Sequence, residues 1–169
     1  MERPNPPPKP RVMIDTSVLL PGIIWPRWPH EILLHALKGD FQLVLSNFLI
    51  IEARDKFEEK FSAYREAFEE FLEDCEYELV PDPTIDEVKE NQHLMGDIND
   101  VPIALAAINS KVDYFISQDK HFTQKTPGTT KLHEQLKIQL SGTFLREVMG
   151  WSSEELENIR QTKNRTRGG

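Results

Sequence analysis

The chain has 169 residues, which is enough for one folded domain with a substantial core and too few for two ordinary domains. Its formal net charge of −8 argues against broad nonspecific attraction to nucleic acid, because such binding depends on Lys and Arg side chains that neutralise phosphates. The single Cys75 cannot form an internal disulfide, and no apolar stretch approaches the roughly 18 residues that a membrane span needs. We therefore expect a reducing, cytoplasmic location and no membrane partner.

Residues 1–10 are rich in proline and lack the apolar segment and the small-residue cleavage site of a secretory signal. Proline runs favour the extended polyproline conformation, so we expect a stiff, disordered arm here. Residues 11–150 are expected to form the folded domain. Residues 151–169 are expected to form a C-terminal helix followed by a frayed polar tail from residue 163 onward.

Hydrophobic periodicity in the first half of the folded region predicts strands that alternate with helices. Short apolar runs bounded by turn residues are typical of buried parallel strands, whereas apolar residues three or four positions apart are typical of amphipathic helices. In chain order, we expect a strand at 11–15, a loop, a helix at 29–37, a strand at 41–45, a helix from a Ser46 or Asn47 cap to about residue 61, a helix at 63–75 and a strand at 77–80.

The second half continues the alternation. Residues 101–108 are apolar nearly all round, and this helix is therefore expected to be buried. In chain order, we expect a weaker helix near 86–95, the buried helix at 101–108, strands at 114–117 and 136–140, a short helix containing residues 144–148, and a terminal helix capped by Ser152 or Ser153.

Alternating strands and helices imply an α/β sandwich, in which right-handed crossovers cover both faces of a parallel sheet. Ligands of such sheets bind at the carboxyl ends of the strands, near the point where the strand order reverses. Asp15 and Asp119 follow the first and fourth predicted strands. If the sheet runs outward in both directions from those two strands, the two carboxylates become neighbours.

Two further acids fit the same cleft, namely Glu52 in a helix and Asp100 at the start of the buried helix. Carboxylates gathered in one cleft repel each other, and hard divalent cations with oxygen ligands relieve that repulsion. Each acid also has a purely structural interpretation. Asp15 could cap a helix, Glu52 could pair with Lys56 one turn later, Asp100 could complement a helix dipole, and Asp119 could be a turn residue.

Other residues have weaker assignments. Lys120, Arg54 and Lys125 could meet substrate phosphates, although each could equally be an ordinary solvated cation. Trp25 and Trp28 could stack on an unpaired base, or their loop could simply fold over the edge of the sheet. The acidic run between residues 55 and 78 is expected to be a solvated helical face, and a docking surface for a basic partner is the alternative. The five histidines show no paired helical spacing and are expected to be scattered surface residues.

Three separated motifs resemble the PIN domain family, especially its VapC-like toxin ribonucleases. They are VMIDTSVL at residues 12–19, DINDVPIALAA at residues 97–107 and DYFISQDKHF at residues 113–122. The resemblance covers roughly residues 12–148 and keeps the motifs in order. It implies a three-layer α/β/α sandwich with a parallel five-stranded sheet of order 3-2-1-4-5.

The resemblance also implies a catalytic site. It suggests an endoribonuclease with one or two Mg²⁺ or Mn²⁺ ions, which hydrolyses RNA through metal-activated water and acts as the toxin of a toxin–antitoxin pair. An antitoxin protein and a homodimer are the implied partners. The metal ligands would be Asp15, Glu52, Asp100 and Asp119, supported by Thr16, Ser117 and Asp97. Ser17 departs from the Asn that many members of the family carry at this position.

Two other functions remain open. A haloacid-dehalogenase-type phosphoryl-transfer enzyme also carries an aspartate after its first strand, but it needs a second acid two residues later, where this chain has Ser17. A noncatalytic PIN-like binding module would keep the same ligands without turnover. Metal affinity followed by an RNA cleavage assay distinguishes that module from an enzyme.

Overall fold

The structure is a computed structural model that describes residues 8–167, with side chains described up to residue 160. Its centre is a five-stranded sheet in which every neighbouring pair is parallel and the strand order is β3-β2-β1-β4-β5. The strands are β1 (Arg11–Ile14), β2 (Gln42–Ser46), β3 (Tyr77–Val80), β4 (Tyr114–Ile116) and β5 (Ile138–Gln139). The α/β fold and the strand order agree with the expectation from the sequence.

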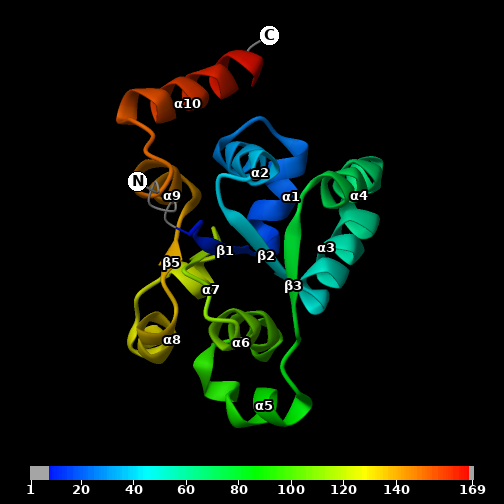
Figure 1. Cartoon of the computed structure of the whole chain (residues 1–169), viewed down its shortest axis with the longest axis vertical. Coiled ribbons are helices and arrows are strands. Elements are labelled where there is room, and N and C mark those ends of the chain that lie inside the picture. Colours follow the sequence, from blue (N-terminus) through cyan, green and yellow to red (C-terminus); the bar gives the residue numbers. More distant parts are fainter. Residues whose placement is uncertain (1–7, 168–169) are drawn as a thin grey trace, which may run out of the picture.

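Helices pack on both faces of the sheet, so the chain forms three layers. In Figure 1, α1 and α2 lie above the strands, and α5, α6 and α8 lie below them. The helices are α1 (Thr16–Ile24), α2 (Trp28–Lys38), α3 (Asn47–Lys60), α4 (Arg65–Asp74), α5 (Ile85–Glu90), α6 (Val101–Asn109), α7 (Lys120–Thr123), α8 (Thr130–Gln135), α9 (Ser141–Glu147) and α10 (Ser153–Arg167).

The central position of β1 explains its composition. Val12, Met13 and Ile14 are completely buried, because β1 pairs with β2 on one side and with β4 on the other while helices cover both of its faces. A strand of this kind must be apolar on both faces. The switch in strand order lies between β1 and β4, and the carboxyl ends of these two strands carry Asp15 and Asp119.

The first helix, α1, was not predicted from the sequence. Residues 16–28 were expected to form a loop, but residues 16–24 form α1 even though Pro21 and Gly22 lie within it. A Cβ atom at Gly22 would lie 2.7 Å from Leu33 Cδ1, so glycine permits close contact between α1 and α2. Tertiary packing therefore outweighs two residues that disfavour helix interiors.

Other element boundaries also differ from the prediction. β5 is only two residues long, and neither α7 nor α8 was predicted. α10 continues to Arg167, beyond residue 163, where a polar tail was expected to begin. Residues 1–7 of the expected proline-rich arm lie outside the described residues, whereas Pro10 accepts a backbone hydrogen bond from Gln42 at 2.9 Å.

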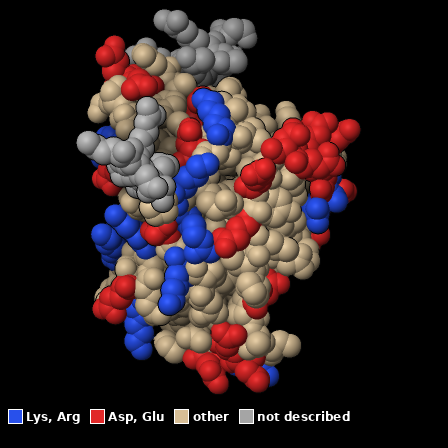
Figure 2. Space-filling view, in the orientation of Figure 1, with Lys and Arg blue, Asp and Glu red and all other residues tan. Residues whose placement is uncertain are grey.

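The acidic run between residues 55 and 78 lies mostly on the exposed surface of α3 and α4, as expected. Figure 2 shows the red acidic side chains gathered over these helices at the upper right. Arginines neutralise part of this charge, because Arg54 forms a bidentate pair with Glu69 at 2.6 and 2.9 Å, and Arg65 pairs with both Glu58 and Glu69. Among the described residues, no helix has the length and apolar character that crossing a membrane requires.

Candidate metal centre

Asp15 is the most deeply buried acid of the candidate site. It directly follows β1, and its side chain is only 3% exposed. Ser17 donates to Asp15 Oδ1 from both its hydroxyl, at 2.5 Å, and its backbone N–H, at 3.1 Å. Ser117 Oγ donates to Asp15 Oδ2 at 2.7 Å. Asp15 therefore caps α1, as its structural interpretation predicts, and its carboxylate also lies close enough to Asp119 for the two charges to interact.

Burial raises the pKa of Asp15 from 3.8 to about 7. The hydrogen bonds from Ser17 and Ser117 oppose this shift because they favour the ionised carboxylate, whereas the nearby charge of Asp119 adds to the shift. The folded protein thus retains a carboxylate whose negative charge is poorly compensated. A bound cation would supply the missing compensation.

Asp119 lies at the carboxyl end of the neighbouring strand β4 and caps α7. Its Oδ1 accepts a hydrogen bond from the backbone N–H of His121 at 2.9 Å. Ser117 connects the two aspartates, because its hydroxyl donates to Asp15 and accepts from the backbone N–H of Asp119 at 3.0 Å. The hydroxyl of Ser117 is thus shared by the carboxyl ends of β1 and β4.

Asp100, which is the N-cap of α6, and Glu52 of α3 come to the same region. The pKa of Asp100 is raised, first by burial and then by the charges of Asp119, Asp97 and Glu52, whereas His121 opposes the rise. Glu52 Oε1 pairs with Lys56 at 2.9 Å, but Glu52 Oε2 and Asp100 Oδ2 are buried without a hydrogen-bond partner. Buried carboxylate oxygens without partners are unfavourable, and a divalent cation would satisfy them. The donor set therefore fits a hard metal ion.

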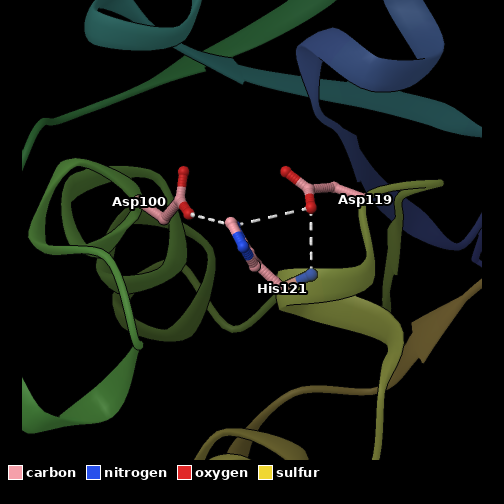
Figure 3. A group of neighbouring side chains, drawn as sticks. All are labelled: Asp100, Asp119 and His121. Carbon is pink, nitrogen blue, oxygen red and sulfur yellow. Dashed lines mark hydrogen bonds and ion pairs between the residues drawn. The ribbon is translucent and has the colours of Figure 1, made fainter.

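His121 is an additional member of the cluster, although it was expected to be one of several scattered surface histidines. Figure 3 shows its ring between Asp100 and Asp119. Its Nδ1 lies 3.5 Å from Asp100 Oδ2 and 3.7 Å from Asp119 Oδ1. One potential ligand atom from each of these residues lies within 4.8 Å of those of the other two. Imidazole nitrogen could thus join carboxylate oxygen as a ligand.

The supporting residues differ in part from the expectation. Thr16 Oγ1 accepts a hydrogen bond from Lys56 Nζ at 3.0 Å, and within the described part of the chain its side chain makes no hydrogen bond to a carboxylate of the cluster. Ser17, treated as a departure from the family pattern, instead orients Asp15 and also accepts from the backbone N–H of Gln118 at 2.8 Å. Asp97 is exposed and caps the short 3-10 helix η3 (Ile98–Asp100). It affects the site because its negative charge helps to raise the pKa of Asp100.

A sequence signal for Ser17 and His121 does exist. Each follows an N-capping aspartate by two residues and donates its backbone N–H to that aspartate, which draws its side chain toward the same carboxylate. The spacing was visible in the sequence. Whether the side chain turns inward, however, depends on the packing of the helix that follows.

The candidate substrate contacts separate into two groups. The guanidinium of Arg54 is paired with Glu69 and is directed to α4, so its placement gives no support to a phosphate contact. Lys120 is exposed, directly follows Asp119, and lines a cavity of about 300 Å³ together with His93 and His121. Lys125 lines a separate cavity beside α8. Lys120 therefore remains the better placed of the proposed cations.

Two solved structures share the overall fold. The crystal structure of PAE2754 from Pyrobaculum aerophilum aligns with a TM-score of 0.53 and 16% identity, covering 83% of this chain and 96% of that chain. VapBC2 from Rickettsia felis, bound to a DNA fragment from its promoter, aligns with a TM-score of 0.54 and 16% identity, covering 77% of this chain and 98% of that chain. At this level of identity the likeness shows the fold alone. A comparison with curated protein sequences finds no match.

A family model described as the PIN domain matches residues 11–121, which is more than half of the chain. The matched segment includes four of the five strands and all four acids of the cluster, Asp15, Glu52, Asp100 and Asp119. The strand order β3-β2-β1-β4-β5 is consistent with the fold of this family, which the sequence match indicates independently. The chain belongs to the PIN domain family.

Proposed function

We propose that this protein is an endoribonuclease that uses one or two Mg²⁺ or Mn²⁺ ions to hydrolyse RNA. The observation that carries this proposal is that the charges of four acids interact near the carboxyl edge of the sheet, and two of these acids have a buried oxygen that makes no hydrogen bond. PIN domains are generally metal-dependent nucleases, so the family assignment supports the same reaction class. The residues proposed to hold the metal are Asp15, Glu52, Asp100 and Asp119.

When bound, a divalent ion would activate water and offset the negative charge that develops on the scissile phosphate. The protein's own contribution is to hold the carboxylates in place before substrate arrives. Ser17 and Ser117 fix both oxygens of Asp15, and the backbone N–H of His121 fixes one oxygen of Asp119. Lys56 holds one oxygen of Glu52 and leaves the other available.

We further propose that the protein is the toxin of a toxin–antitoxin pair and forms a homodimer. The structural likeness to VapBC2 of Rickettsia felis supports the choice of this class among PIN proteins. An antitoxin would be a protein partner encoded by a neighbouring gene. Co-expression of the protein with its upstream neighbour, followed by co-purification and an RNA cleavage assay, tests this part of the proposal.

The enzymatic proposal is tested with purified protein and single-stranded RNA. Cleavage should require Mn²⁺ or Mg²⁺ and stop when a chelator is added. Asp119→Asn should abolish cleavage without unfolding the protein, because it removes one of several like charges. Asp97→Asn, which alters an exposed acid beside the site, should reduce cleavage much less than Asp119→Asn does. Persistent cleavage in chelator contradicts the proposal, and metal binding without cleavage of any RNA identifies a noncatalytic binding module instead.

A further inference from the structure

Another cavity lies between α1, the start of α2 and α10, and its lining includes Gln118, which directly precedes Asp119. Its volume is about 350 Å³, within the range of about 300–1,000 Å³ that is usual for small-molecule sites. Pro21, Pro29 and Ile159 form an apolar wall, and Gln118, Arg27 and Arg160 add polar and positively charged groups. The segment from Trp25 to Trp28, which the metal centre does not use, thus contributes Arg27 and Trp28 to this cavity.

Gln118 connects the cavity to the metal centre. It directly precedes Asp119, and its backbone N–H donates to Ser17 Oγ, which in turn donates to Asp15. Pro21 follows Ser17 by four residues on α1 and therefore lies on the same face of that helix. A strand of RNA with its scissile phosphate at the carboxylates would place an adjoining nucleotide near this cavity.

Arg27 has no acidic partner among the described residues, although the chain as a whole is acidic. Among the arginines whose side chains are described, Arg27 alone makes no ion pair. Its guanidinium carbon lies 5.5 Å from the centroid of the Trp25 ring. Arg160 makes only a long, exposed pair with Glu157 at 3.8 Å. Two cations with little local neutralisation therefore line one cavity, and an anionic ligand would complement them.

The cavity has a fixed wall. The indole N–H of Trp28 donates to the carbonyl of Leu156 at 3.0 Å, which ties α10 to the start of α2. The other side of Trp28 packs against Gly142, where a Cβ atom would lie 3.0 Å from the ring. The position of Ile159 and Arg160 over the cavity is thus coupled to the body of the domain.

We propose that this cavity binds one nucleotide of the RNA strand beside the scissile phosphate. This inference rests on the proposed function, because it extends the same substrate past the metal centre. Arg27 and Arg160 bind the phosphate of that nucleotide, and the apolar wall packs against its base. The Gln118 amide, which both donates and accepts hydrogen bonds, contacts the base edge. Proteins read single-stranded RNA through such unstacked bases.

Nuclear magnetic resonance of the ¹⁵N-labelled protein in EDTA tests the cavity directly. Nucleoside 5′-monophosphates should cause saturable shifts of the Trp28 indole N–H and of the backbone amides of Arg27, Gln118 and Ile159. Inorganic phosphate serves as the reference probe and should bind more weakly, since it lacks a base. Absence of shifts at these residues overturns the inference, and so do equal affinities for phosphate and for all four nucleotides.

A second measurement tests the role of the cations. The logarithm of the affinity for single-stranded RNA, measured in EDTA, falls linearly with the logarithm of salt concentration by about 0.7 per phosphate contact. Arg27→Ala should reduce that slope by about 0.7. Lys89→Ala removes the same charge from α5, at the opposite end of the molecule from α10, and should leave the slope unchanged (Figure 1). Equal slopes for the two variants overturn the inference.

Both measurements are independent of turnover. If metal-dependent cleavage occurs but the cavity residues do not respond to nucleotides, the cavity inference fails and the proposed function stands. If the cavity binds nucleotides but no RNA is cleaved with Mg²⁺ or Mn²⁺, the proposed function fails and the nucleotide site stands.

Discussion

Replacing Asp15 with Asn should stabilise the metal-free protein increasingly as the pH rises. The folded pKa of Asp15, about 7, lies above its ordinary value of 3.8, so the unfolded chain releases this proton at a lower pH than the folded chain does. Stability from this group is therefore fully present below about pH 4 and is lost as the pH rises through about 7. Asn carries no charge and lacks this dependence.

The size of this stability change follows from the difference between the two pKa values of Asp15. At about 1.4 kcal/mol per pH unit, ionisation of Asp15 costs the folded state up to about 4 kcal/mol at pH 8. The free energy of unfolding of Asp15→Asn minus that of wild type should rise by a comparable amount between about pH 4 and pH 8. Imperfect hydrogen bonding of Asn with Ser17 and Ser117 adds an offset that does not vary with pH.

Urea unfolding of both proteins in EDTA at several pH values measures this difference. Carboxylates that do not interact with Asp15, such as Glu69, whose pKa Arg54 and Arg65 hold below its usual range, affect both proteins equally and cancel. Parallel pH profiles for wild type and variant would refute the reasoning. They would mean that Asp15 is not strained by burial and that the carboxylate cluster does not need a cation for charge compensation.

Three further predictions concern ligand binding, thiol reactivity and packing. Mn²⁺ at a hundredfold excess over its Kd should stabilise wild type by about 2.7 kcal/mol, or several degrees in Tm, whereas Asp15→Asn should gain little; equal calorimetric shifts would place the ion elsewhere. Burial raises the pKa of the Cys75 thiol to about 11, so at pH 8 a disulfide reagent should modify the native protein about a hundredfold more slowly than the urea-unfolded protein, and equal rates would contradict this burial. Gly22→Ala should lower stability by about 1–3 kcal/mol because its Cβ would meet Leu33, whereas Gly96→Ala, with no atom within 4 Å of its Cβ, should be nearly neutral by urea unfolding.

The sequence alone determined the sheet and the positions of two of the four acids of the candidate site. The central strands are buried on both faces and must be apolar over their whole length, which makes them visible as short runs such as residues 12–14. Acids that directly follow such runs, like Asp15 and Asp119, lie at the carboxyl edge of a parallel sheet by topology. Glu52 and Asp100 were candidates in the sequence, but their positions alone did not bring them to the cleft, because Glu52 lies in a helix and Asp100 at the start of one, and helices reach the cleft through packing rather than through strand position.

Only the tertiary structure decided which side chains meet. Propensity disfavours α1 because it contains Pro21 and Gly22, yet burial against α2 stabilises it, and that helix places Ser17 on Asp15. His121 joins Asp100 because α7 follows β4 beside the start of α6, a neighbourhood that no local spacing encodes. The cavity of Arg27 and Arg160 depends on α10 packing against Trp28, more than a hundred positions earlier in the chain. Local sequence specifies secondary structure through nearby interactions, whereas these contacts depend on the free energy of packing the whole chain.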